Sequence, residues 1–256
     1  MEKHIEKELR RIEVREKNLE SRTGIVEKNL NSLMNKVENK IPEDLKDKLE
    51  LAFYKGFGIV FEKGMGVIDK TYDKKNMKMD FRAYRAIIDK DCEALIHLRK
   101  RIDKSLKKDL ALTAVEGTGL GILGIGLPDI PLFIGVILRS IYKIASTYGF
   151  DYSSDNEKCY ILKLITGAMT RGEGRERINK QIRRMEYLID NNIYESDLDR
   201  EMKRTASVMA NELVTYKFVQ GMPVVGVVGG YTNVKVLNRI VTYSHLKYER
   251  RCLERL

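Results

Sequence analysis

One apolar stretch constrains what this chain can fold into more than any other feature. It runs from Ala111 to Arg139 and reads ALTAVEGTGLGILGIGLPDIPLFIGVILR, with only two acids, Glu116 and Asp129. Charged residues make up 33% of the chain, so this stretch has to be buried in a core or placed in another apolar environment. No uncharged run reaches about 18 residues, the usual minimum for a membrane-spanning helix.

A second stretch, from Phe218 to Val234, has the same character and reads FVQGMPVVGVVGGYTNV. Both stretches contain glycines four residues apart, a spacing that lets two backbones approach closely, and both contain proline. We expect the two stretches to pack on each other. Their glycines, prolines and flanking polar residues are the candidate functional residues: Glu116, Gly117, Gly121, Pro128, Asp129, Pro131, Gln220, Gly221, Pro223, Gly226, Gly230 and Asn233.

The acids that bracket the first stretch have two interpretations. Glu116 and Asp129 either pair with nearby bases or cap helices, or one of them is a functional acid whose pKa the apolar surroundings raise. Gln220 and Asn233 flank the second stretch, and we expect them to hydrogen-bond backbone groups that Pro223 leaves free.

The remaining chain has helical periodicity and no convincing series of alternating strands, which predicts an all-α fold, a multi-helix bundle. Helices are predicted at 43–69, 81–109, 157–169, 178–189, 198–213 and 234–256, with a loop at 71–80, and a further helix continues past Arg139 to residue 148. Tyr148–Gly149 marks the end of one helix, and Asp197 caps another.

The first forty residues form an amphipathic, heptad-like pattern. Its apolar positions are spaced three and four residues apart: Ile5, Leu9, Ile12, Leu19, Val26, Leu30, Leu33 and Val37. Such a helix either folds back on the protein or forms an arm for a helical partner. We therefore divide the chain into an N-terminal arm, 1–42, and a helical domain, 43–256, with a break at the Ile41–Pro42 step.

The net charge of +10 favours an acidic partner. A basic run leads into the first apolar stretch, and we expect it to contact anionic lipid: Arg99, Lys100, Arg101, Lys104, Lys107 and Lys108. The chain has no Trp, few aromatic residues and no helix-turn-helix or zinc-finger spacing, so nucleic acid is a disfavoured partner.

No set of residues in the sequence specifies a reaction. The Gly119–Gly124 segment matches G-x-G-x-x-G but lacks the preceding strand that a dinucleotide site needs. The three histidines are isolated and the three cysteines lie far apart, so we expect no metal, cofactor or catalytic residue. The charged N-terminus and the unpaired cysteines favour a cytoplasmic protein.

Several motifs together resemble the EcsC protein family of bacteria. They are Glu116–Gly117, the Pro128–Pro131 core, Tyr148–Gly149, the Gln-Gly-Met-Pro sequence that begins at Gln220, Asn233 and the terminal ERRCLER, with a match over roughly residues 45 to 256. The family is named for a protein encoded beside the Ecs ABC transporter. This resemblance implies a membrane-transport context and carries no catalytic residues with it.

Three functions fit these observations. The first is a non-enzymatic accessory protein, peripheral at the inner face of the cell membrane, with an anionic lipid surface or a membrane protein as partner. The second is a soluble helical enzyme with an apolar pocket around Glu116 and Asp129. The third is a soluble interaction module whose N-terminal arm binds a partner helix.

Overall fold

The computed structural model describes residues 5–19, 42–88, 97, 99, 100, 102, 104, 130–193, 197–219 and 229–255. These residues form helices and no strand, which confirms the predicted all-α fold. After a helix at residues 5–19, the elements follow in this order: α2 (Glu43–Ile59), the π-helical turn η1 (Val60–Gly64), α3 (Met65–Asp69), α4 (Lys74–Ile88), α6 (Ile130–Thr147), α7 (Asp155–Met169), α8 (Gly172–Asp190), α9 (Leu198–Val219) and α10 (Gly229–Leu253).

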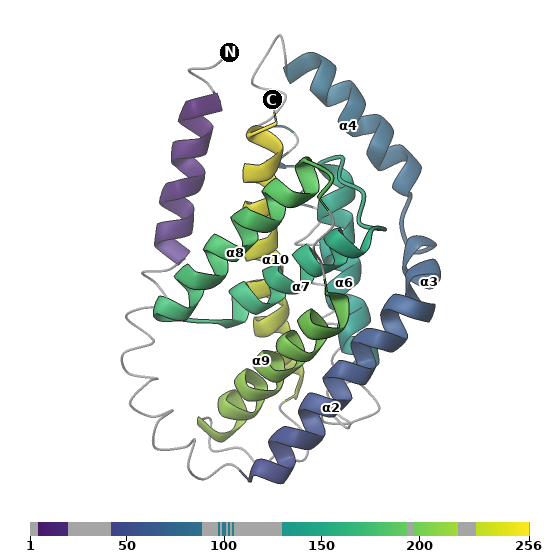
Figure 1. Ribbon diagram of the computed structural model, residues 1–256. Helices are drawn as coiled ribbons and strands as arrows, with labels where there is room; N and C mark the ends of the chain where they lie inside the picture. The colour runs from purple at the N-terminus through teal and green to yellow at the C-terminus, as the bar shows by residue number, and fades with distance from the viewer. Residues whose placement is uncertain are drawn as a thin grey trace.

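Helix α7 lies at the centre of the bundle (Figure 1) and packs against α8, α9 and α10. Every residue from Cys159 to Met169 is buried, because neighbouring helices cover this helix all round. At Gly167 the approach of α10 is so close that an added Cβ would lie 2.7 Å from the hydroxyl oxygen of Tyr243. A larger residue at this position would require the Tyr243 side chain to shift.

The turn between α6 and α7 follows from local sequence. Gly149 adopts a left-handed conformation with φ of 78°, which ends α6, and the backbone N–H of Phe150 donates to the carbonyl of Ala145 at 2.8 Å. The Ser154 hydroxyl then caps α7 by accepting from the backbone N–H of Glu157 at 3.2 Å. The predicted end of α6 at Tyr148–Gly149 is confirmed.

Several predicted boundaries were wrong: α8 begins at Gly172 rather than near Ile178, and α9 ends at Val219 rather than near Leu213. The polar segment 71–80 was predicted as a loop, but α4 begins at Lys74, because the Asp73 carboxylate accepts from the backbone N–H of Asn76 at 2.9 Å and caps the helix. The closing helix begins at Gly229, inside the second apolar stretch, rather than at Val234. Its packing against α6 and α7 outweighs the low helix propensity of the glycines.

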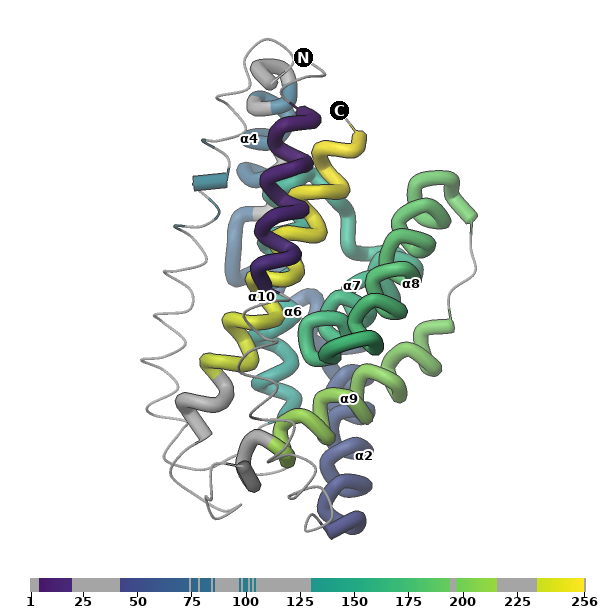
Figure 2. The backbone as a smooth tube through the Cα atoms, turned by 90° about the vertical axis from the view of Figure 1, so that its left-hand side faces the viewer, coloured from purple at the N-terminus to yellow at the C-terminus, as the bar shows by residue number. Residues whose placement is uncertain are grey.

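The N-terminal helix, residues 5–19, lies along α10, and Figure 2 shows the two helices side by side. Ile12 is fully buried against Leu246 and Leu253, and Ile5, Leu9 and Leu19 pack around them. This is the arrangement in which the amphipathic helix folds back on the protein. The proposed domain boundary after residue 42 stays a prediction.

One of the described helices, α6, is long and apolar enough to cross a membrane. Its window, Ile130–Thr147, is 56% buried inside the protein, and the helix packs against α2, α4 and α10. Core helices commonly share this length and composition, so the packing of α6 accounts for its apolar character.

Candidate anion-binding pocket

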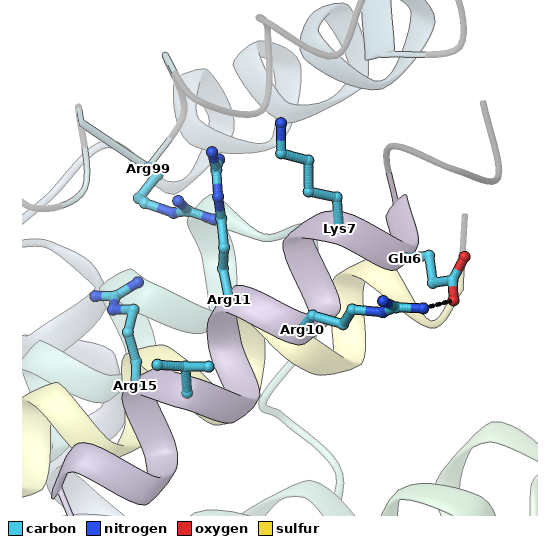
Figure 3. Close-up of a pocket in the computed structure, with 7 residues that line it drawn as sticks. Glu6, Lys7, Arg10, Arg11, Arg15 and Arg99 are labelled. Atoms are coloured by element: carbon cyan, nitrogen blue, oxygen red, sulfur yellow. Dashed lines mark hydrogen bonds and ion pairs between the residues drawn. The ribbon is translucent and has the colours of Figure 1, made fainter.

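A pocket of about 840 Å³ opens beside the N-terminal helix (Figure 3). Most of the described residues that line it are basic: Glu6, Lys7, Arg10, Arg11, Val14, Arg15 and Arg99. Lys7 and Arg11 extend toward the side of the helix from which Arg99 approaches, whereas Arg10 turns toward Glu6. Among the described lining residues, five cations therefore share one solvent-open hollow with one acid, Glu6.

The helical period of the N-terminal segment explains this placement. Apolar side chains at 5, 9, 12 and 19 face α10, so positions 7, 11 and 14, which follow one another by four and three residues, share the opposite flank. Val14 is 56% exposed and supplies an apolar patch among the cations. The aliphatic stems of the lysine and arginine side chains extend that patch, because such side chains cover apolar surface with their methylenes.

Two buried carboxylates hold the inner wall of the pocket. Glu8 accepts from Arg11 and, at 2.7 Å, from Arg99. Glu249 of α10 accepts from Arg99 and, at 3.2 Å, from Arg15. The Glu249 side chain is 1% exposed and that of Glu8 is 8% exposed, so neither carboxylate is open to solvent for an external cation. They position the three guanidinium groups and leave the anion-binding capacity to the arginines.

The electrostatics of the pocket favour an anion. Burial opposes the charge of Arg99, but Glu249 and Glu8 outweigh this effect and raise the pKa of Arg99 above its usual value. The five cations face three carboxylates, counting Glu6 with Glu8 and Glu249, so these side chains carry an excess of two positive charges. Partly buried guanidinium groups bind carboxylates and phosphates through paired N–H donors.

A buried histidine lies close to this cluster. His245 of α10 is 3% exposed, and its Nε2 lies 2.8 Å from the hydroxyl oxygen of Tyr148. Burial, together with the charges of Arg15 and Arg99, lowers the pKa of His245 to about 3. The imidazole is therefore neutral in the folded protein at pH 7, and the positive field of the arginines reaches into the core.

Within the terminal ERRCLER sequence, Glu249 belongs to the pocket, whereas Arg251 has a separate, structural role. Arg251 of α10 is 1% exposed, and its Nη1 donates to both carboxylate oxygens of Glu157 at 2.9 Å. Its Nη2 donates to Asp190 of α8 at 3.1 Å, and the guanidinium carbon lies 4.5 Å from the ring centroid of Phe150. One arginine thus joins α7, α8 and α10 inside the core.

The described residues of the basic run that was predicted to contact lipid lie in different environments. Arg99 lies in the pocket and is held by buried carboxylates, whereas Lys100 and Lys104 are exposed. Arg101, Lys107 and Lys108 lie outside the described residues. The contact with lipid stays a prediction for all of them.

Most candidate residues of the two apolar stretches also lie outside the described residues: Glu116, Gly117, Gly121, Pro128, Asp129, Gln220, Gly221, Pro223 and Gly226. Pro131 is in the first turn of α6, where proline is tolerated, and Gly230 and Asn233 belong to the first turns of α10. The expected packing of one stretch on the other, and the enzyme hypothesis around Glu116 and Asp129, therefore stay predictions.

The pocket residues of the N-terminal helix were not among the predicted site residues. The sequence does contain a signal for them, a stripe of cations at Lys7, Arg11 and Arg15, each four residues from the next. Such a stripe is also typical of a solvated helix face, so the sequence pattern does not by itself indicate a pocket. Among the described residues, no group of three His, Cys, Asp or Glu side chains could hold a metal ion.

The fold is a helical bundle, and the described pocket beside its N-terminal helix is lined mostly by basic residues. The sequence profile of the EcsC protein family matches residues 6–253, and the chain belongs to this family. The match begins inside the N-terminal helix, so it includes a segment that the motifs of the sequence analysis did not cover.

Two proteins of Bacillus subtilis (strain 168) are similar to the chain. Protein EcsC is 26% identical over 147 residues, which cover 56% of this chain and 57% of that protein. Uncharacterized protein YdbA is 30% identical over 156 residues, which cover 56% of this chain and 53% of that protein. The chain thus spans about half the length of these relatives. No solved structure matches the chain significantly.

Proposed function

We propose that this EcsC-family chain is a non-enzymatic accessory protein that attaches peripherally to the anionic cytoplasmic face of a membrane. The observation that carries the proposal is the excess of positive charge around an open pocket that also exposes Val14. A surface that combines cations with exposed apolar side chains suits the boundary between lipid headgroups and acyl chains.

Peripheral attachment is favoured over insertion by the packing of α6. The one described helix with the length and composition to span a membrane uses more than half of its residues for contacts within the protein. An accessory role beside an ABC transporter completes the proposal, and this part rests on the context that the family resemblance implies.

Vesicle flotation tests the attachment. The protein is mixed with neutral phosphatidylcholine vesicles or with vesicles that contain phosphatidylglycerol, and the bound fraction is measured at low and high salt. We expect binding to the anionic vesicles only, with loss at high salt, because the Debye length falls to about 3 Å at 1 M salt. Equal binding to neutral vesicles, or no binding to either kind, would rule out electrostatic attachment.

A pair of charge-matched variants locates the attachment surface. K7Q/R11Q removes two cations from the pocket, whereas R177Q/K180Q removes two exposed cations from α8. Each cation near an anionic surface contributes about 1 kcal/mol, so K7Q/R11Q should bind roughly 30-fold more weakly. Similar losses in both variants would mean that only the total charge matters and that the pocket is not the contact surface.

A further inference from the structure

The geometry of the pocket distinguishes a discrete ligand site from a diffuse basic surface. The carboxylates that hold Arg11, Arg15 and Arg99 are themselves buried, so these guanidinium groups are positioned before any ligand arrives. The side-chain exposure rises from 17% at Arg99 to 38% at Arg15 and 50% at Arg11. The three guanidinium groups thus form one wall of the pocket, and their exposure to solvent decreases from Arg11 to Arg99, which pairs with Glu249 of α10.

The hydrogen-bonding capacity of this wall is only partly used. Each guanidinium group has five N–H donors. Arg11 and Arg15 each donate through Nη1 to a buried carboxylate, and Arg99 donates through Nε and Nη2. The donors beyond these contacts have the fork geometry that matches the oxygens of a phosphate group. Lys7 adds a fourth cation on the same side of the helix.

The charge of the pocket selects among phosphate ligands. A phosphate monoester carries about −1.5 to −2 charges at pH 7, which matches the excess of two positive charges, whereas a phosphodiester carries a single negative charge. The pocket volume of about 840 Å³ exceeds what a phosphate alone needs and leaves room for the group that carries it.

We infer that this pocket is a binding site for a phosphate monoester group, with Arg11, Arg15, Arg99 and Lys7 as its ligands. A membrane lipid with a terminal phosphate and a free phosphate monoester share this chemistry. The lipid form of the inference rests on the proposed membrane attachment, and the free form does not.

Calorimetric titration with inorganic phosphate tests the site without a membrane. The wild-type chain should bind one phosphate saturably at pH 7.5, and binding should weaken as the pH is lowered and HPO4²⁻ takes up a proton, because the ligand then loses one of its two negative charges. K7Q/R11Q should lose this binding, and R177Q/K180Q should keep it. Absence of saturable binding to the wild type would overturn the inference.

A charge-preserving variant separates a shaped site from simple attraction. R11K keeps the cation but loses the fork of donors, and Arg11 is half exposed, so the fold should tolerate the change. We expect R11K to bind phosphate about tenfold more weakly while its thermal melt stays close to that of the wild type. Unchanged phosphate affinity in R11K would show that only charge is recognised and would overturn the shaped site.

Vesicles of matched surface charge distinguish the sources of the phosphate. Preference for phosphatidic acid over phosphatidylglycerol, lost in R11K, supports a lipid monoester. Binding of free phosphate without any vesicle binding supports a soluble ligand and removes the proposed attachment instead. Equal binding to both anionic lipids, without phosphate binding in solution, keeps the attachment and overturns the site.

Discussion

The buried pair of Arg251 and Glu157 provides the sharpest test of how this bundle is held together. Both residues are 1% exposed, and the guanidinium group makes three hydrogen bonds to carboxylates on α7 and α8. Replacing Arg251 with methionine keeps a flexible side chain of moderate length and removes the charge. Glu157 then retains the hydroxyl of Tyr248, which donates at 2.8 Å, as its partner among the contacts described here.

The expected cost follows from leaving a carboxylate buried without its cation. Removing one partner of a buried ion pair typically destabilises a protein by about 3–5 kcal/mol. Three bonds to charged groups, at about 1.5–3 kcal/mol each, would exceed this range, but such contributions within one network are not additive. We therefore expect R251M to lower the free energy of unfolding at pH 7 by about 3–5 kcal/mol.

The pH dependence gives the prediction a second readout. Burial raises the pKa of the Glu157 carboxyl, while the charge of Arg251 counteracts this effect. Without Arg251 the pKa of Glu157 in the folded variant rises further. Between the ordinary pKa of 4.5 and this raised pKa, Glu157 is protonated in the folded variant and ionised in the unfolded chain. A raised carboxyl pKa contributes stability at low pH that is lost as the pH rises, so the deficit of R251M should shrink from pH 7 to pH 5.

Urea denaturation followed by circular dichroism at 222 nm measures these differences, because the described secondary structure is helical. The comparison includes E157Q and the double variant R251M/E157Q. If the pair is coupled, the double variant should cost clearly less than the sum of the single variants. A cost below about 1 kcal/mol for R251M, or strict additivity, would refute the reasoning.

Three further predictions concern pH, the N-terminal helix and the packing of α7. The pKa of His245 is about 3 in the folded protein and 6.5 in the unfolded chain, so its contribution to stability is lost as the pH falls below 6.5. Lowering the pH from 7 to 5 should therefore reduce the free energy of unfolding of the wild type by about 2 kcal/mol more than that of H245N. I12A should destabilise the protein by about 2 kcal/mol or more in urea denaturation, whereas V14A, at an exposed position of the same helix, should change stability by less than about 0.5 kcal/mol. G167A should destabilise the protein by about 1–3 kcal/mol, because the Tyr243 side chain of α10 occupies the space of the added Cβ. G135A should stabilise it by about 0.5–1 kcal/mol, because the added Cβ meets no described atom within 4 Å. Thermal melts measure both effects.

Each of these comparisons has an outcome that contradicts it. Parallel pH profiles for the wild type and H245N would mean that the histidine titrates normally in the folded protein. Equal effects of I12A and V14A would favour the separable N-terminal arm over a helix that covers α10. Stabilisation by G167A would show that Tyr243 moves aside at little cost.

The sequence by itself determined the helical class and several boundaries, because these depend on interactions within a few residues. The seam of Ile5, Leu9, Ile12 and Leu19 repeats with a helical period, and the structure buries Ile12 completely and packs the others around it. Gly149 ends α6 because its own φ is positive. The start of α4 was predicted wrongly, although its cause is also local: the Asp73 carboxylate caps a polar segment whose composition resembles a loop.

Only the tertiary structure decided which charged residues form the candidate site. Arg99 looked like one member of an exposed basic run, yet it pairs with Glu8 and Glu249, which lie 91 and 150 residues away in the chain. Arg251 and Glu157 are likewise separated by 94 residues. Whether a cation meets solvent or a buried carboxylate depends on which helices pack together, and a local sequence pattern does not contain that information.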